Sequence, residues 1–150
     1  MKFKFVFERV LQHRKSLENI AQKEFQESLS ELSRQQGILR DMEQSLSLAH
    51  KSIGQRLGQG GFGTLASVYL MDDFIKGQEV LIERQKQLLV EKEKEVEARR
   101  EILRQRTIET KIIERLKERK KREFVAESER RDQAQLDELG VLRHSRRIVK

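Results

Sequence analysis

Apolar residues recur every seven positions along two separate parts of this chain. In the first part the register is broken only by Glu18, and its apolar members are Leu11, Phe25, Leu32, Leu39, Leu46 and Ile53. In the second part the register is unbroken at Val68, Ile75, Ile82, Leu89, Val96 and Leu103. A sustained seven-residue repeat forms one apolar stripe along an α-helix, and that stripe needs a partner helix to cover it. The pattern therefore predicts two helices that cover each other.

A second stripe accompanies the first one on the N-terminal helix, and its side chains are small and partly polar. Its members are Ala21, Ser28, Gln35, Met42 and Ala49. Small residues in a seam let two helices approach closely, although they bury less apolar surface than a leucine zipper does. We therefore expect close contact along this seam and only moderate stability.

The segment between the two repeats contains five of the eight glycines, and the chain has no proline. Glycine adopts backbone angles that suit a turn, whereas proline disrupts helix interiors. We expect an all-α fold, a long two-helix antiparallel coiled-coil hairpin forming one domain. Its parts are arm one at about 3–53, a glycine-rich tip at 54–63, arm two at about 64–139 and a basic tail at 140–150, within a single domain 1–150.

The composition agrees with a thin helical rod. Hydrophobic residues make up 36% of the chain and charged residues 38%, against about 45–50% and about 25% in typical soluble domains. Disordered chains have similar compositions, but the regular apolar repeat favours the coiled coil. The same stripes can pair within one chain or between two chains. The expected form is a monomeric hairpin, with an intermolecular dimer left open.

The net charge of +7 comes from 32 basic and 25 acidic residues that are mostly interspersed. The basic excess is concentrated in residues 115–122, where six of eight residues are basic, and in residues 143–147. Few aromatic residues are available to stack on bases, and no nucleic-acid motif occurs. An acidic protein or membrane surface is thus the expected partner. A nucleic-acid-binding coiled coil remains an alternative, which predicts affinity that falls steeply with salt.

The sequence also bears on the compartment. The chain contains no cysteine, as is usual in a reducing cytoplasm. No stretch approaches the roughly 20 apolar residues that a membrane span needs. Glu8 and Arg9 interrupt the apolar N-terminus before it reaches the length of a secretory signal. We therefore expect an intracellular chain without a transmembrane segment.

No pattern in the chain predicts catalysis. Residues 58–63 match the nucleotide-binding pattern G-x-G-x-x-G, but helical repeats flank them in place of the strands that such a loop requires. His13, His50 and His144 are too far apart in sequence to define a metal site. A two-helix rod also lacks the concave pocket in which an acid or base is tuned. We expect no enzyme activity, no cofactor and no metal.

The two ends of the chain resemble those of one protein family. The opening combines Phe3-Lys4-Phe5, Glu8-Arg9-Val10-Leu11, Leu17-Glu18 and Gln22-Lys23-Glu24-Phe25, and the ending is Gln133-x-x-Leu136-Asp137-Glu138. These motifs, in this order and about 130 residues apart, are similar to those of FliJ, the small coiled-coil protein of bacterial flagellar export. The resemblance covers the whole chain in length and layout.

This resemblance implies a specific role. FliJ-like proteins look like the two-helix stalk of the rotary ATPase γ subunit. The resemblance implies a non-enzymatic stalk in the centre of the flagellar export ATPase hexamer, promoting its assembly and activity. It further implies contacts with the cytoplasmic domain of the export gate and with export chaperones, which are thereby recycled. The location implied is cytoplasmic, peripheral to the inner face of the cell membrane at the flagellar base. The alternative is the stalk of a virulence-type type III secretion system.

The resemblance also suggests which residues make these contacts. By the γ-subunit analogy, the ATPase-binding candidates are Arg115, Lys117, Arg119, Lys120, Lys121, Arg122, Gln133, Leu136, Asp137 and Glu138. The export-gate candidates are Tyr69 and a helical face at spacing i, i+4, i+7, i+11, formed by Phe74, Gln78, Leu81 and Gln85. The alternative for Phe74 and Leu81 is burial in the seam between the helices.

Overall fold

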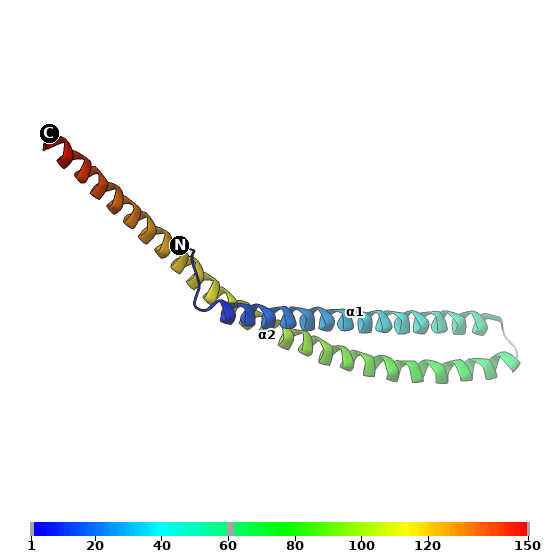
Figure 1. Cartoon of the computed structure of the whole chain (residues 1–150). Helices are drawn as coiled ribbons and strands as arrows, with labels where there is room; N and C mark the ends of the chain where they lie inside the picture. Colours follow the sequence, from blue (N-terminus) through cyan, green and yellow to red (C-terminus); the bar gives the residue numbers. More distant parts are fainter. Residues whose placement is uncertain (1, 60–61, 150) are drawn as a thin grey trace. The chain divides into compact units, whose positions relative to one another are not determined.

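The fold consists of two helices. The computed structural model describes residues 2–59 and 62–149, with α1 at Glu8–Gln59 and α2 at Phe62–Ile148 (Figure 1). No strand occurs among these residues. Residues 2–5 have no regular secondary structure, and the carbonyl of Phe5 accepts a hydrogen bond from the amide of Glu8, the first residue of α1, at 3.2 Å. The all-α prediction is confirmed.

The chain divides into two compact units, one containing residues 20–104 and the other residues 1–19 and 105–150. In the first unit Glu24 pairs with Arg99, and Gln35 with Gln85. Residue numbers therefore rise along α1 as they fall along α2. The other unit has the same antiparallel order, since Glu8 pairs with Lys117. The antiparallel two-helix coiled coil is confirmed in each unit.

The predicted apolar stripe of α2 forms its side of the seam in the 20–104 unit. Ile75, Ile82, Leu89 and Val96 are all buried. The deepest residues of α1 in this unit are the small, partly polar ones, namely Ala21, Ser28, Gln35 and Ala49. The larger residues from Phe25 to Ile53 on the leucine register are only half-buried. Small side chains let the α2 side chains reach the backbone of α1, while the larger ones flank this contact.

A polar layer crosses the middle of this seam. The side-chain amide of Gln85 donates to the backbone carbonyl of Gln35 at 3.0 Å and to its side-chain oxygen at 2.7 Å. The amide of Gln35 in turn donates to Glu31 at 2.9 Å. Buried polar groups are costly unless they are hydrogen-bonded. This layer therefore favours one register of α1 against α2, because any shift would leave the glutamines unpaired.

Polar contacts also join the helices in the other unit. Arg14 pairs with Glu109 at 2.7 Å, and the hydroxyl of Thr107 donates to Glu18 at 3.0 Å. Glu18 interrupts the apolar register of α1, and this hydrogen bond gives its carboxylate a partner across the seam. Leu11 is the most deeply buried apolar residue of the unit.

The N-terminal residues pack against α2 ahead of the start of α1. The Phe3 ring lies 5.6 Å from the Phe124 ring, centroid to centroid, and the rings of Phe5 and Phe7 meet edge-on at 5.9 Å. These residues, with Lys120 and Glu123, line a groove of about 430 Å³. We call this packing of residues 3–7 on Phe124 the aromatic clasp. It extends the contact with α2 to residues that precede the start of α1 at Glu8.

The helix limits differ from the expected ones. α1 begins at Glu8, and it continues through Gly54 and Gly58 to Gln59. α2 begins at Phe62 and continues to Ile148, whereas arm two was expected to end near residue 139, before the basic tail at 140–150. One glycine costs a helix only about 1 kcal/mol, and strong helix formers lie on both sides of residue 140. Arg146 and Arg147 also favour the last turn, where the helix dipole is negative. Residues 60 and 61 of the expected tip lie outside the described residues.

Candidate functional site

The basic stretch 115–122 is not uniformly available for binding. The ammonium of Lys117 lies 2.8 Å from the carboxylate of Glu8, and both residues are half-buried. The hydrogen bond from Lys117, with a smaller effect from Gln12, lowers the pKa of Glu8. Arg119 and Lys120 lie 3.8 and 3.2 Å from Glu123 on the next turn. Lys117 therefore makes a contact across the interhelical seam, and its part in ATPase binding stays a prediction.

Three arginines of this stretch share one exposed face of α2. Arg115, Arg119 and Arg122 follow the spacing i, i+4, i+7, which places them in line along a helix. With Ile112, Leu116 and Glu118 they line a groove of about 670 Å³. We call Arg115, Arg119 and Arg122 the arginine face. It combines positive charge with an exposed apolar residue, Ile112, and so suits a partner with acidic and apolar groups.

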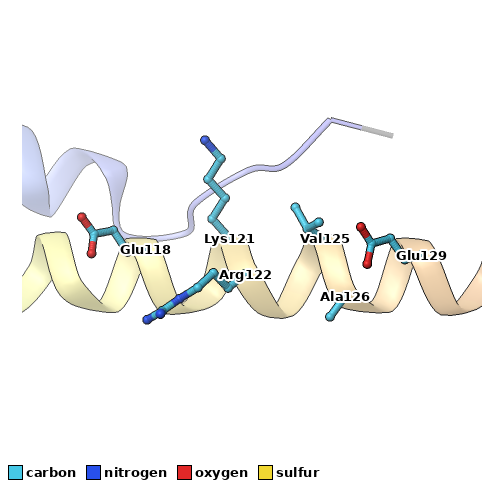
Figure 2. Close-up of a pocket in the computed structure, with 6 residues that line it drawn as sticks. All are labelled: Glu118, Lys121, Arg122, Val125, Ala126 and Glu129. Carbon is cyan, nitrogen blue, oxygen red and sulfur yellow. The ribbon is translucent and has the colours of Figure 1, made fainter.

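A second groove continues this surface toward the C-terminus. Figure 2 shows its six residues on α2, which enclose about 490 Å³: Glu118, Lys121, Arg122, Val125, Ala126 and Glu129. Val125 supplies its apolar part, and acidic and basic side chains surround it. Such a shallow, mixed-charge surface fits contact with another protein better than enclosure of a small molecule.

The C-terminal candidates lie on a part of α2 where every residue from Val125 to Val149 is exposed. Within it the side-chain amide of Gln133 donates to Asp137 at 3.0 Å, a contact inside one helical turn. Leu136 and Glu138 project into solvent. No described residue covers this segment, so its apolar side chains are available to a partner.

The structure separates the five export-gate candidates into two groups. Phe74 and Leu81 are 46% and 43% exposed, which excludes their burial in the seam, and Tyr69 is also exposed. Gln78 is half-buried, and Gln85 takes part in the polar layer of the seam. The exposed gate candidates are therefore Tyr69, Phe74 and Leu81, and the gate contact of all five residues stays a prediction.

Sequence reasoning missed one residue of this surface. Leu70 is exposed and lies four residues before Phe74, on the same side of α2. Gly77 lies between Phe74 and Leu81, and open space surrounds the position that its missing Cβ would occupy. The available signal was the i, i+4, i+11 spacing of Leu70, Phe74 and Leu81. We call these three residues the α2 apolar face.

The structure gives no support to a metal or nucleotide site. Within residues 2–59 and 62–149, no three metal-binding side chains come together. His13, His50 and His144 are exposed. The G-x-G-x-x-G segment joins two helices, and its Gly60 and Gly61 lie outside the described residues. Neither helix, over its described length, has a stretch long and apolar enough to cross a bilayer.

An antiparallel helix pair with exposed charged and apolar faces defines a coiled-coil interaction protein. The model of the family "Flagellar FliJ protein" matches residues 3–148, and the chain belongs to that family. It is accordingly a coiled-coil component of the type III export apparatus, of a family that is structural and non-catalytic.

A solved structure has the same fold. It is described as a putative YscO homolog from Chlamydia trachomatis, and it matches with a TM-score of 0.71 and 22% sequence identity, over 99% of each chain. At this identity the likeness concerns the fold alone. A search of the curated proteins found no match.

Proposed function

We propose that this chain is the central stalk of the flagellar export ATPase, where it promotes assembly of the hexamer and ATP turnover. The main support is the exposure of α2 on all sides from Val125 to Ile148. Helices in proteins owe most of their stability to packing, so a partner should cover this segment. A ring of subunits covers a helix on every side, whereas a single flat partner covers only one.

The arginine face supports the same assignment. Its three guanidinium groups lie just before the exposed segment along α2, and Lys121 adds a further exposed positive charge. Positive charge on one face steers a rod toward an acidic partner and sets its orientation. On this proposal the residues that contact the ATPase are the arginine face, Lys121, Leu136, Asp137 and Glu138. Lys117 acts indirectly by holding Glu8.

The test is the ATP turnover of the cognate export ATPase, measured with and without the purified chain at two salt concentrations. Stimulation should saturate near one chain per hexamer. Replacing Arg115, Arg119 and Arg122 with Glu should abolish it. The matched control replaces Lys86, Lys94 and Arg104, which are also exposed on α2, with Glu. This control should leave the stimulation of ATP turnover intact. The stalk proposal is wrong if an ATPase able to form hexamers is not stimulated by the wild-type chain.

A contact with the cytoplasmic domain of the export gate is the second part of the proposal. The α2 apolar face supports it, because Leu70, Phe74 and Leu81 are exposed and lie along one side of α2. The double variant Phe74→Ala and Leu81→Ala should weaken binding to that domain in a pull-down or anisotropy assay. Val80 and Val90 are similarly exposed, and their alanine variants should bind normally.

Chaperone recycling and a location at the flagellar base complete the proposal. They follow from what the family resemblance implies, and no surface of this chain is assigned to the chaperones. A virulence-type export stalk would share the fold, but the match to the flagellar family favours flagellar export. The two readings differ in their partner, so stimulation of a flagellar ATPase and not of a virulence-type one would separate them.

A further inference from the structure

The charge pattern changes where α1 ends and α2 begins. Residues 44–71 contain no acidic residue, and this is the longest such run in a chain that has 25 acidic residues elsewhere. The charged residues that remain in the run are Lys51 and Arg56. Both are exposed. Residues 139–150 likewise contain no acidic residue, but they carry four basic ones, so residues 44–71 differ in combining a low charge with a positive sign.

Large apolar side chains are exposed in the same place. Leu57, Leu65, Tyr69 and Leu70 are 60%, 49%, 66% and 72% exposed. They lie within the last turns of α1 and the first turns of α2, on both helices of the 20–104 unit. We call these four residues the tip surface. A soluble rod gains nothing from exposing them to water, so a partner should cover them.

The exposed apolar residues lie within a short distance of the helix ends, comparable to the depth of a membrane interface. At about 1.5 Å per residue, Leu57 and Leu65 lie roughly 3–5 Å from the ends of their helices, and Tyr69 and Leu70 about 10–12 Å. The polar headgroup layer of one leaflet is roughly 5–8 Å thick. Tyrosine prefers this layer because its ring is apolar and its hydroxyl polar.

Arg56 and Lys51 lie roughly 4 and 12 Å from the end of α1. Their long, flexible side chains reach lipid phosphates while their stems lie along apolar surface. The nearest carboxylate on α2, that of Asp72, lies about 15 Å from its helix start, and Glu43 lies about 24 Å from the end of α1. Asp72 is also paired with Lys76 at 3.0 Å. Carboxylates, which an anionic surface repels, are thus absent from the last turns of α1 and the first turns of α2.

We propose that the tip surface inserts into the headgroup region of an anionic phospholipid bilayer, with Arg56 and Lys51 pairing with lipid phosphates. This goes beyond the proposed stalk function and does not depend on it, because it concerns different residues from those that contact the ATPase. Tyr69 and Leu70 are shared with the proposed gate contact, so the test changes Leu57 and Leu65, which are not gate candidates. A protein surface is the competing occupant, and it would need no exclusion of carboxylates from both helices. The contact would hold one end of the stalk at the membrane surface.

The test measures flotation of the full chain with vesicles of phosphatidylcholine, with or without about 30% phosphatidylglycerol. The key variant carries Leu57→Glu and Leu65→Glu, and the matched control carries Val80→Glu and Val90→Glu, two exposed residues of the same unit. Because the chain has no tryptophan and only one tyrosine, a Tyr69→Trp variant reports from the tip surface alone. Circular dichroism checks that every variant remains helical.

The chain should float with the anionic vesicles, and the leucine variant should lower the bound fraction by about tenfold while the valine variant leaves it unchanged. The emission of Tyr69→Trp should shift to shorter wavelengths on vesicle addition. Absence of flotation, or flotation that survives in the leucine variant, would overturn the proposal. So would an emission shift caused by the gate domain and not by vesicles. ATPase stimulation by the leucine variant should stay normal, which separates this proposal from the stalk function.

Discussion

Leu89 provides a direct test of which residues form the seam. Its side chain is buried at 9% exposure, whereas the next residue, Val90, is 50% exposed on the other side of α2. The change Leu89→Asp removes a buried leucine, worth about 1.5–3 kcal/mol, and places a carboxylate without a partner in the seam. Val90→Asp makes the same kind of change on the solvent side.

The magnitude follows from these environments. Lost burial and an unpaired buried charge together should lower the free energy of unfolding by about 3–5 kcal/mol for Leu89→Asp. For Val90→Asp the free energy of unfolding should fall by less than about 1 kcal/mol, because the substitution changes only the helix propensity of an exposed position. At about 2–4 °C per kcal/mol for a chain of this length, the melting temperature should fall by about 6–20 °C in the first variant only.

The assay is thermal unfolding followed by circular dichroism at 222 nm, with urea unfolding as a second measurement. Both variants and the wild-type chain are compared at the same protein concentration, because any association between chains would alter the melting temperature. Equal melting temperatures for Leu89→Asp and Val90→Asp would refute the assignment of the buried stripe, and with it the register of α2 against α1.

Three further predictions concern other contacts. Gln85→Leu should lower the unfolding free energy by about 1–3 kcal/mol in urea unfolding, because it removes the amide that donates to the side-chain oxygen and the backbone carbonyl of Gln35, and a neutral effect would show that the polar layer is dispensable. Hydrogen bonds from Arg34 and Gln35 lower the pKa of Glu31 to about 2. The ionised Glu31 therefore stabilises the fold above about pH 4.5, and this stabilisation is lost as the pH falls toward 2. Acid unfolding followed by circular dichroism should show this loss in the wild-type chain and not in Glu31→Gln. Phe124→Ala should speed hydrogen exchange of the first turn of α1, which the packing of Phe3 on Phe124 now protects, and unchanged exchange would show that the aromatic clasp is not a stabilising contact.

The fold follows from the sequence because the seven-residue repeat is a long-range regularity. Two registers separated by glycines leave few arrangements other than a helix pair. The limits of the helices were less predictable: Gly140 costs only about 1 kcal/mol, so a helix with good formers on both sides continues through it. Local signals of this size cannot decide a helix end by themselves.

The candidate surfaces were only partly predictable. The exposure of Phe74 and Leu81 was not predictable, because their spacing fits a buried seam as well as an outer face. The burial of the neighbouring Ile75 and Ile82 in the seam decides that Phe74 and Leu81 face outward. Likewise, the deepest stripe of α1 is the small one and not the leucine register. Depth in a helix pair depends on how closely the backbones approach, and a hydrophobicity pattern does not report that distance.

The distribution of ion pairs separates two roles that the net charge combines. Arg14, Arg99 and Lys117 pair with carboxylates of the opposite helix at 2.7–2.8 Å. Each such partly exposed pair contributes only about 0–1 kcal/mol, but it helps to set the register. Reversing one of them should therefore change unfolding more than binding. Reversing the arginine face should change binding and leave unfolding nearly unaltered, because those guanidinium groups pair with nothing on α1 among the described residues. Salt should accordingly weaken the association with an acidic partner much more than it weakens the fold.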